Sequence, residues 1–170
     1  KVIIFILSTV MLLSTTEVSA MEFDETANFM QATLLMEAET GQVLKEENGY
    51  EKLPIGTLNK VMTTLLVAES IERKELSAET LVTTSKHANS MQQAQIWLLV
   101  GEQMSVADLL KGVIIGNAND ACVALAEAVA GSEEEFTELM NERAKELGMN
   151  NTLFLDCTGL NEEGQYSTAN

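Results

Sequence analysis

The apolar positions of the chain fall into a short strand-like region followed by a longer helical one. Two short segments that carry apolar residues, 32–36 and 42–46, flank Glu39-Thr40-Gly41, which has the composition of a turn. Together they predict a β-hairpin. Two strands alone are marginally stable and leave an exposed sheet edge, so we expect this hairpin to need further strands for its stability.

Helical spacing starts after Pro54 and Gly56, which interrupt the preceding segment. From there apolar residues recur at roughly helical intervals, namely at Leu58, Met62, Leu65, Leu66 and Ile71. This pattern predicts a helix that begins close to Thr57.

Capping signals predict further helices. Ser105 followed by Asp108, and Ser132 followed by Glu135, have the spacing of a capping box, in which a side chain satisfies free amides at a helix N-terminus. Apolar residues follow each pair, as expected when a helix then packs on a core.

Two glycines are natural stops for helices near 120–130 and 133–147, because Gly131 and Gly148 follow the last residues of these segments. The chain has no internal repeat, low-complexity tract or Pro-rich linker. We therefore expect no domain boundary within residues 21–170.

The N-terminal residues have the pattern of a secretory signal peptide. An apolar run from Val2 to Leu13 follows Lys1, and Val18-Ser19-Ala20 is a small-residue site of the A-x-A type. The run is short for a membrane span. We predict a signal peptide over residues 1–20, with an uncleaved anchor as the alternative.

The formal net charge of −16 argues against nucleic acid and anionic membrane surfaces as partners, because both would repel this protein. Metal ligands are also sparse. His87 is the only histidine, and Cys122 and Cys157 lie far apart without ligand spacing, so we predict no metal and no cofactor. Cys122 falls on the apolar face of a predicted helix, which favours a buried thiol. A secreted location would permit a disulfide to Cys157, but nothing in the sequence predicts one.

The segment around Thr57 carries the candidate chemistry. Thr57 and Lys60 are three residues apart, so on a helix the hydroxyl and the amine share one face. In the related S-x-x-K arrangement, a Lys that accepts a proton activates the hydroxyl for attack on an acyl carbon, and the helix N-terminus favours the negative charge that develops. By itself the spacing is a weak signal, because a capping Thr followed by a surface Lys would give it too.

Several further segments, in order along the chain, resemble the serine-type D-alanyl-D-alanine carboxypeptidases, which are low-molecular-weight penicillin-binding proteins. The resemblance covers about residues 31–170. It is carried by Leu35-Met36-Glu37-Ala38-Glu39-Thr40-Gly41-Gln42-Val43-Leu44, Ser85-Lys86-His87-Ala88, Gly101-Glu102-Gln103-Met104-Ser105-Val106-Ala107-Asp108-Leu109-Leu110, Asn119-Asp120-Ala121-Cys122-Val123-Ala124-Leu125-Ala126-Glu127, Asn151-Thr152-Leu153-Phe154, Thr158-Gly159-Leu160 and Tyr166-Ser167-Thr168-Ala169.

The resemblance implies an α/β (α+β) fold of the β-lactamase and penicillin-binding transpeptidase type. It further implies that residues 21–170 hold the N-terminal strand hairpin and the helical subdomain, with the C-terminal sheet strands missing. The family's three catalytic motifs are altered or absent. Thr57 stands where the nucleophilic Ser is expected, Asn117-Ala118-Asn119 replaces S-x-N, and no Lys in the 170 residues is followed by Thr-Gly or Ser-Gly.

Two functions from different classes follow. The resemblance implies an envelope enzyme that trims the terminal D-Ala from peptidoglycan stem peptides through an acyl-enzyme, and that also reacts with β-lactams. Its expected catalytic residues are Thr57 as nucleophile, Lys60 as base, and Asn117 and Asn119 as groups that orient the substrate. The alternative is a protein that binds cell-wall peptide or a partner without turnover, because an amide at Asn117 cannot relay a proton as a hydroxyl can.

Overall fold

The computed structural model describes residues 31–161 and 163–170. The predicted signal peptide lies outside the described residues. In chain order, the elements are β1 (Thr33–Met36), β2 (Val43–Glu47), the short 3₁₀ helix η1 (Gly56–Leu58), α2 (Asn59–Glu72), β3 (Leu81–Thr83), α3 (Lys86–Asn89), β4 (Gln103–Ser105), α4 (Val106–Gly116), α5 (Asn119–Ala130) and α6 (Glu133–Glu146).

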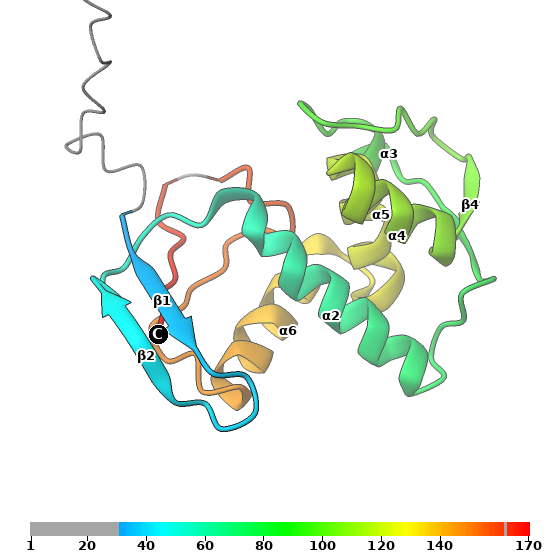
Figure 1. Ribbon diagram of the computed structural model, residues 1–170. Coiled ribbons are helices and arrows are strands. Elements are labelled where there is room, and N and C mark those ends of the chain that lie inside the picture. Colours follow the sequence, from blue (N-terminus) through cyan, green and yellow to red (C-terminus); the bar gives the residue numbers. More distant parts are fainter. Residues whose placement is uncertain (1–30, 162) are drawn as a thin grey trace, which may run out of the picture. The chain divides into compact units, whose positions relative to one another are not determined.

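The predicted hairpin is confirmed, within one residue at its strand ends. Strands β1 and β2 pair antiparallel (Figure 1). Thr33 lies opposite Glu47 in this pairing. The Glu37 carboxylate shapes the turn, because it accepts hydrogen bonds from the backbone N–H groups of Glu39 and Thr40 and from the Thr40 hydroxyl. These bonds, the one from the Thr40 hydroxyl above all, lower the pKa of Glu37.

Helix α5 is the centre of the helical region and packs against α2, α3, α4 and α6. Its residues 121–126 are all fully buried, which explains their nearly uninterrupted run of small and apolar side chains. The large buried side chains around it are contributed by the neighbouring helices and the loop before β4, and they include Val67, Leu98, Leu109, Phe136 and Met140. This core fixes the ends of α2 and α4, on which the candidate chemistry lies.

The predicted caps are present at α4 and α6. The hydroxyl of Ser105 accepts the N–H of Asp108 at 3.1 Å, and the hydroxyl of Ser132 accepts the N–H of Glu135 at 3.1 Å. The helices predicted near 120–130 and 133–147 correspond to α5 and α6.

The C-terminal residues that the structure describes lie beside the segment that precedes η1. Isolated bridges pair Leu53 with Ser167 and Leu153 with Tyr166. They bring the segment after α6 next to the residues that lead into η1. Among the described residues, no helix combines the length and the apolar character that crossing a membrane requires.

Candidate active site

An open hollow of about 540 Å³ brings together three of the four predicted site residues, Thr57, Lys60 and Asn117. Thr57 lies in η1, Lys60 in the first turn of α2, and Asn117 at the C-terminal end of α4. The rest of the lining comes from α2 and α4 and is mostly apolar, with Val61, Thr64, Leu65, Ala68, Val113 and Ile114. The hollow therefore combines a hydroxyl, an amine and an amide on largely apolar walls.

Lys60 is a buried lysine, with 5% of its surface exposed. Its Nζ donates a hydrogen bond to the backbone carbonyl of Thr158 at 2.8 Å. Burial lowers the pKa of the Lys60 amine, while the nearby Asp156 carboxylate acts in the opposite direction. A lysine whose pKa is lowered by burial is suited to accept a proton from a neighbouring hydroxyl.

Thr57 is exposed, so its side chain is open to a ligand in the hollow. It precedes α2 by two residues, and the N-terminus of that helix favours negative charge in its vicinity. The β-branched side chain has fewer χ1 rotamers than Ser, which restricts the directions in which its hydroxyl can point.

Asn117 has a structural reason for being an amide. It is the C-cap of α4 and adopts the left-handed conformation, with φ of 54°, which Asn tolerates better than most residues. The side chain is exposed and lines the hollow. Both the cap and the substrate-orienting role predicted from the sequence are compatible with this position.

Asn119 lies apart from the lining of the hollow, as the first residue of α5 with only 2% of its surface exposed. Its Nδ2 donates to the carbonyl of Gln92 at 2.7 Å, and its backbone N–H donates to the carbonyl of Ala94 at 2.8 Å. Its Oδ1 is buried and has no hydrogen-bond partner among the described residues. In this structure, Asn119 therefore fastens the loop 92–94 to the start of α5.

Sequence reasoning gave no role to the segment that contacts Lys60. Residues 156–159 lie against the start of α2, and Gly159 there has a φ of 87°. A Cβ atom at Gly159 would overlap the carbonyl of Gly56, next to Thr57. The Thr158-Gly159-Leu160 motif was one signal of this segment, but its long-range contact with Lys60 has no local signature.

Potential metal ligands do not gather in the part of the chain that the structure describes. Over residues 31–161 and 163–170, no group of three or more His, Cys, Asp or Glu side chains could hold a metal ion. The two cysteines are free, buried thiols.

Comparison with solved structures supports the architecture. The crystal structure of the D-alanyl-D-alanine carboxypeptidase DacD from Francisella tularensis matches with a TM-score of 0.79 and 37% identity, over 81% of this chain and 33% of that one. Penicillin-binding protein D2 from Listeria monocytogenes, in its ampicillin-bound form, matches with a TM-score of 0.69 and 30% identity, over 81% of this chain and 56% of that one. The fold is thus the mixed helix and strand fold of penicillin-binding proteins, present in part.

Sequence comparison gives the same family. The D-alanyl-D-alanine carboxypeptidase DacF of Bacillus subtilis is 46% identical over 145 residues, which are 85% of this chain and 37% of the relative. DacC of Escherichia coli is 43% identical over 82% of this chain and 36% of the relative. The chain thus spans little more than a third of the length of these relatives. A model of the family described as D-alanyl-D-alanine carboxypeptidase matches residues 17–170, and the chain belongs to this family.

Proposed function

We propose that this chain carries the nucleophile and base of a D-alanyl-D-alanine carboxypeptidase-like protein that acts in peptidoglycan maturation. The observation that carries the proposal is the placement of Thr57 and the buried amine of Lys60 around one hollow. Relatives named D-alanyl-D-alanine carboxypeptidase, at 46% and 43% identity, support the substrate class. The proposed substrate is a peptidoglycan stem peptide that ends in D-Ala-D-Ala.

In the proposed reaction, the Thr57 hydroxyl attacks the carbonyl carbon of the penultimate D-Ala. Lys60 accepts the hydroxyl proton and passes it to the amine of the terminal D-Ala, which leaves as the peptide bond breaks. Water then hydrolyses the ester on Thr57 and restores the hydroxyl. Asn117 lines the hollow, where its amide can hydrogen-bond the peptide backbone. Asn119 does not line the hollow, and its proposed role is indirect, through fixing the loop 92–94.

The lowered pKa of Lys60 favours this step, because it increases the fraction of the amine that is neutral and able to accept a proton. A lysine at its ordinary pKa would be protonated and could not take the proton. Because burial is the main cause, the lowered pKa depends on the segment that holds the amine staying in place.

A second candidate function is peptide binding without turnover. It is favoured by the methyl group of Thr57, which restricts the rotamers of the hydroxyl, and by an amide at Asn117, which cannot relay a proton. In this candidate, the hollow holds the D-Ala-D-Ala end and no ester forms.

Location and β-lactam binding belong to the same proposal. We place the protein on the outer face of the bacterial cell envelope, in keeping with the predicted signal peptide and the proposed peptidoglycan substrate. Penicillin-binding protein D2 of Listeria monocytogenes was solved with ampicillin and with cefotaxime bound. A β-lactam is therefore a suitable probe of the hollow in this chain.

The two candidates are separated by release of D-alanine from a synthetic peptide that ends in Lys-D-Ala-D-Ala. The enzyme proposal predicts release by the chain, faster release by Thr57→Ser, and none by Thr57→Ala or Lys60→Met. Peptide binding, measured by calorimetry, with no release by either the chain or Thr57→Ser would instead support the non-catalytic candidate.

A further inference from the structure

Three consecutive backbone carbonyls, those of residues 156–158, are each held by a side chain of α2. The carbonyl of Asp156 accepts from Asn59 at 3.0 Å, and that of Cys157 accepts from Thr63 at 2.8 Å. The third carbonyl, of Thr158, accepts from Lys60 at 2.8 Å. The position of the Lys60 amine is therefore tied to the position of this segment.

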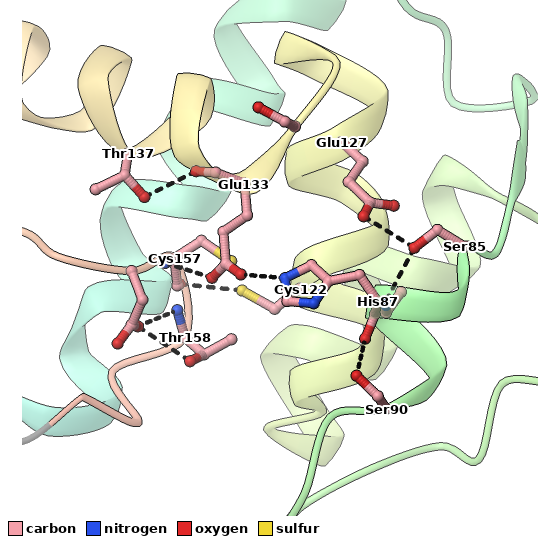
Figure 2. Close-up of polar contacts among 12 residues, drawn as sticks. Ser85, His87, Ser90, Cys122, Glu127, Glu133, Thr137, Cys157 and Thr158 are labelled. Atoms are coloured by element: carbon pink, nitrogen blue, oxygen red, sulfur yellow. Dashed lines mark hydrogen bonds and ion pairs between the residues drawn. The ribbon is translucent and has the colours of Figure 1, made fainter.

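The other side of the segment is anchored by Glu133, the first residue of α6. Its Oε1 accepts hydrogen bonds from both the backbone N–H and the thiol of Cys157, each at 3.2 Å (Figure 2). Its Oε2 lies 2.6 Å from Nε2 of His87, so the carboxylate has partners at both oxygens. The Glu133 side chain is only 14% exposed. It thus bridges α3, α6 and the segment that holds Lys60.

The thiols of Cys122 and Cys157 add further hydrogen bonds to the segment 156–158. Cys122 on α5 donates from its Sγ to the carbonyl of Cys157 at 3.1 Å, next to the bond from Thr63. The neighbouring Cys122 thiol and burial raise the pKa of the Cys157 thiol well above its usual range, with Glu133 adding to the effect. Cys157 therefore remains a protonated donor to Glu133 and is unsuited to act as a nucleophile.

Glu133 differs from the two glutamates that follow it. Glu134 and Glu135 are exposed at the N-terminus of α6, where the helix dipole favours their charge. Glu133 shares that benefit, but it also accepts two hydrogen bonds from Cys157, which directly precedes the residue whose carbonyl holds Lys60.

We propose that Glu133 is a positioning residue for the Lys60 amine, which it holds in place through Cys157 and Thr158. Removing the carboxylate leaves the N–H and the thiol of Cys157 without an acceptor, so the segment 156–158 moves away from α2 and admits water to Lys60. The importance of this effect for acyl transfer rests on the function proposed above, whereas the effect on Lys60 itself does not.

The test measures the titration of Lys60 in the 170-residue chain. Acetic anhydride acetylates the neutral amine at a series of pH values, and mass spectrometry of the peptide that contains Lys60 measures the extent of acetylation at each pH. The variant is Glu133→Ala, and the matched control is Glu134→Ala, the same change one residue along the same helix. Far-ultraviolet circular dichroism verifies that each protein is folded.

We expect Glu133→Ala to raise the acetylation midpoint of Lys60 by about half a pH unit, because hydration removes the burial that lowers its pKa; at a fixed pH this is roughly threefold less neutral amine. Glu134→Ala should leave the midpoint unchanged. Glu133→Gln, which keeps an acceptor oxygen, should give an intermediate value, and it decides the question if Glu133→Ala does not fold.

An unchanged midpoint in a folded Glu133 variant would overturn the proposal, and so would an equal shift in Glu134→Ala. Acetylation reports on the amine whether or not the chain forms an acyl-enzyme. A chain that releases no D-alanine can therefore still show the positioning effect, and the two proposals can fail independently.

Discussion

The helical region and the hairpin β1–β2 differ in how far their apolar side chains are exposed. Leu125 on α5 is fully buried, whereas Leu44 on β2 is 58% exposed, and Leu35 and Met36 on β1 are more than half exposed as well. Every residue of β2 is exposed. The helices bury one another around α5, while among the apolar side chains of β1 and β2 only Leu34 is even partly buried.

This contrast indicates which part of the chain is stabilised by its own packing. A helix that packs on three or four others gains hydrophobic free energy from each of them, whereas an isolated two-stranded hairpin is marginal in water. Thr57, Lys60 and Asn117 all lie on elements of the helical region. The geometry of the candidate site should therefore survive changes in the hairpin and respond strongly to changes around α2 and α5.

The largest expected effect on stability is a difference between alanine substitutions at two glycines that both have a positive φ. Gly159 has a φ of 87° and Gly41 a φ of 71°, but a Cβ atom at Gly159 would overlap the carbonyl of Gly56, whereas at Gly41 it would meet nothing within 4 Å. Gly159→Ala should lower the free energy of unfolding by about 3 kcal/mol or more, and Gly41→Ala by about 1–2 kcal/mol, the cost of a left-handed backbone alone. Urea denaturation measures both, and equal losses would contradict the contrast.

Truncation of a leucine in each region comes next. Leu125→Ala removes a fully buried side chain from the centre of the helical core and should cost about 2–5 kcal/mol. Leu44→Ala removes a side chain that is 58% exposed and should change the free energy of unfolding by less than about 0.5 kcal/mol. A large loss from Leu44→Ala would show that the hairpin is packed against another part of the protein or a second copy.

A smaller effect is expected from removing one hydroxyl in each region. Ser132→Ala deletes the cap of α6 and should destabilise the protein by about 1 kcal/mol. Thr40→Ala deletes the hydroxyl that donates to Glu37 in the exposed hairpin turn, and the thermal midpoint should stay the same. The comparison would fail if Thr40→Ala lowered the thermal midpoint as much as Ser132→Ala.

Lys60 should make the stability of the protein depend on pH. Because the pKa of Lys60 is lower in the folded than in the unfolded state, the unfolded chain binds more protons between the two values, and the contribution of Lys60 to stability rises with pH across that window. Below the folded pKa, the cost of the buried charge is constant. The free energy of unfolding of the chain should therefore increase, relative to that of Lys60→Met, as pH rises towards the usual lysine pKa. Urea titrations at several alkaline pH values measure this difference, and a constant difference would contradict it.

Much of the fold could be predicted because its signals are local. The turn Glu39-Thr40-Gly41, the cap at Ser132 and the stop at Gly131 each act within a few residues, and they marked the hairpin, α5 and α6. Strands β3 and β4 pair antiparallel in a second small sheet, which was not predicted. Its strands are only three residues long, and neither carries a pattern long enough to recognise.

The candidate site was predictable to a lesser extent. Thr57 and Lys60 are predicted from their spacing and from the family resemblance, but the contact between Lys60 and Thr158 joins residues 98 positions apart, and no periodicity encodes it. Glu133 has no recognisable signal in the sequence, because its contacts with Cys157 and His87 exist only after α3, α6 and the following segment have packed. The roles of Asn117 and Asn119 stay predictions.

The most direct test of the account is the intact mass of the folded chain after incubation with benzylpenicillin. We expect a covalent adduct on the tryptic peptide of residues 53–60, which contains Thr57, with a higher yield in Thr57→Ser and none in Thr57→Ala. An absence of adduct in both the folded chain and folded Thr57→Ser would contradict the claim that Thr57 and Lys60 form an acyl-transfer site.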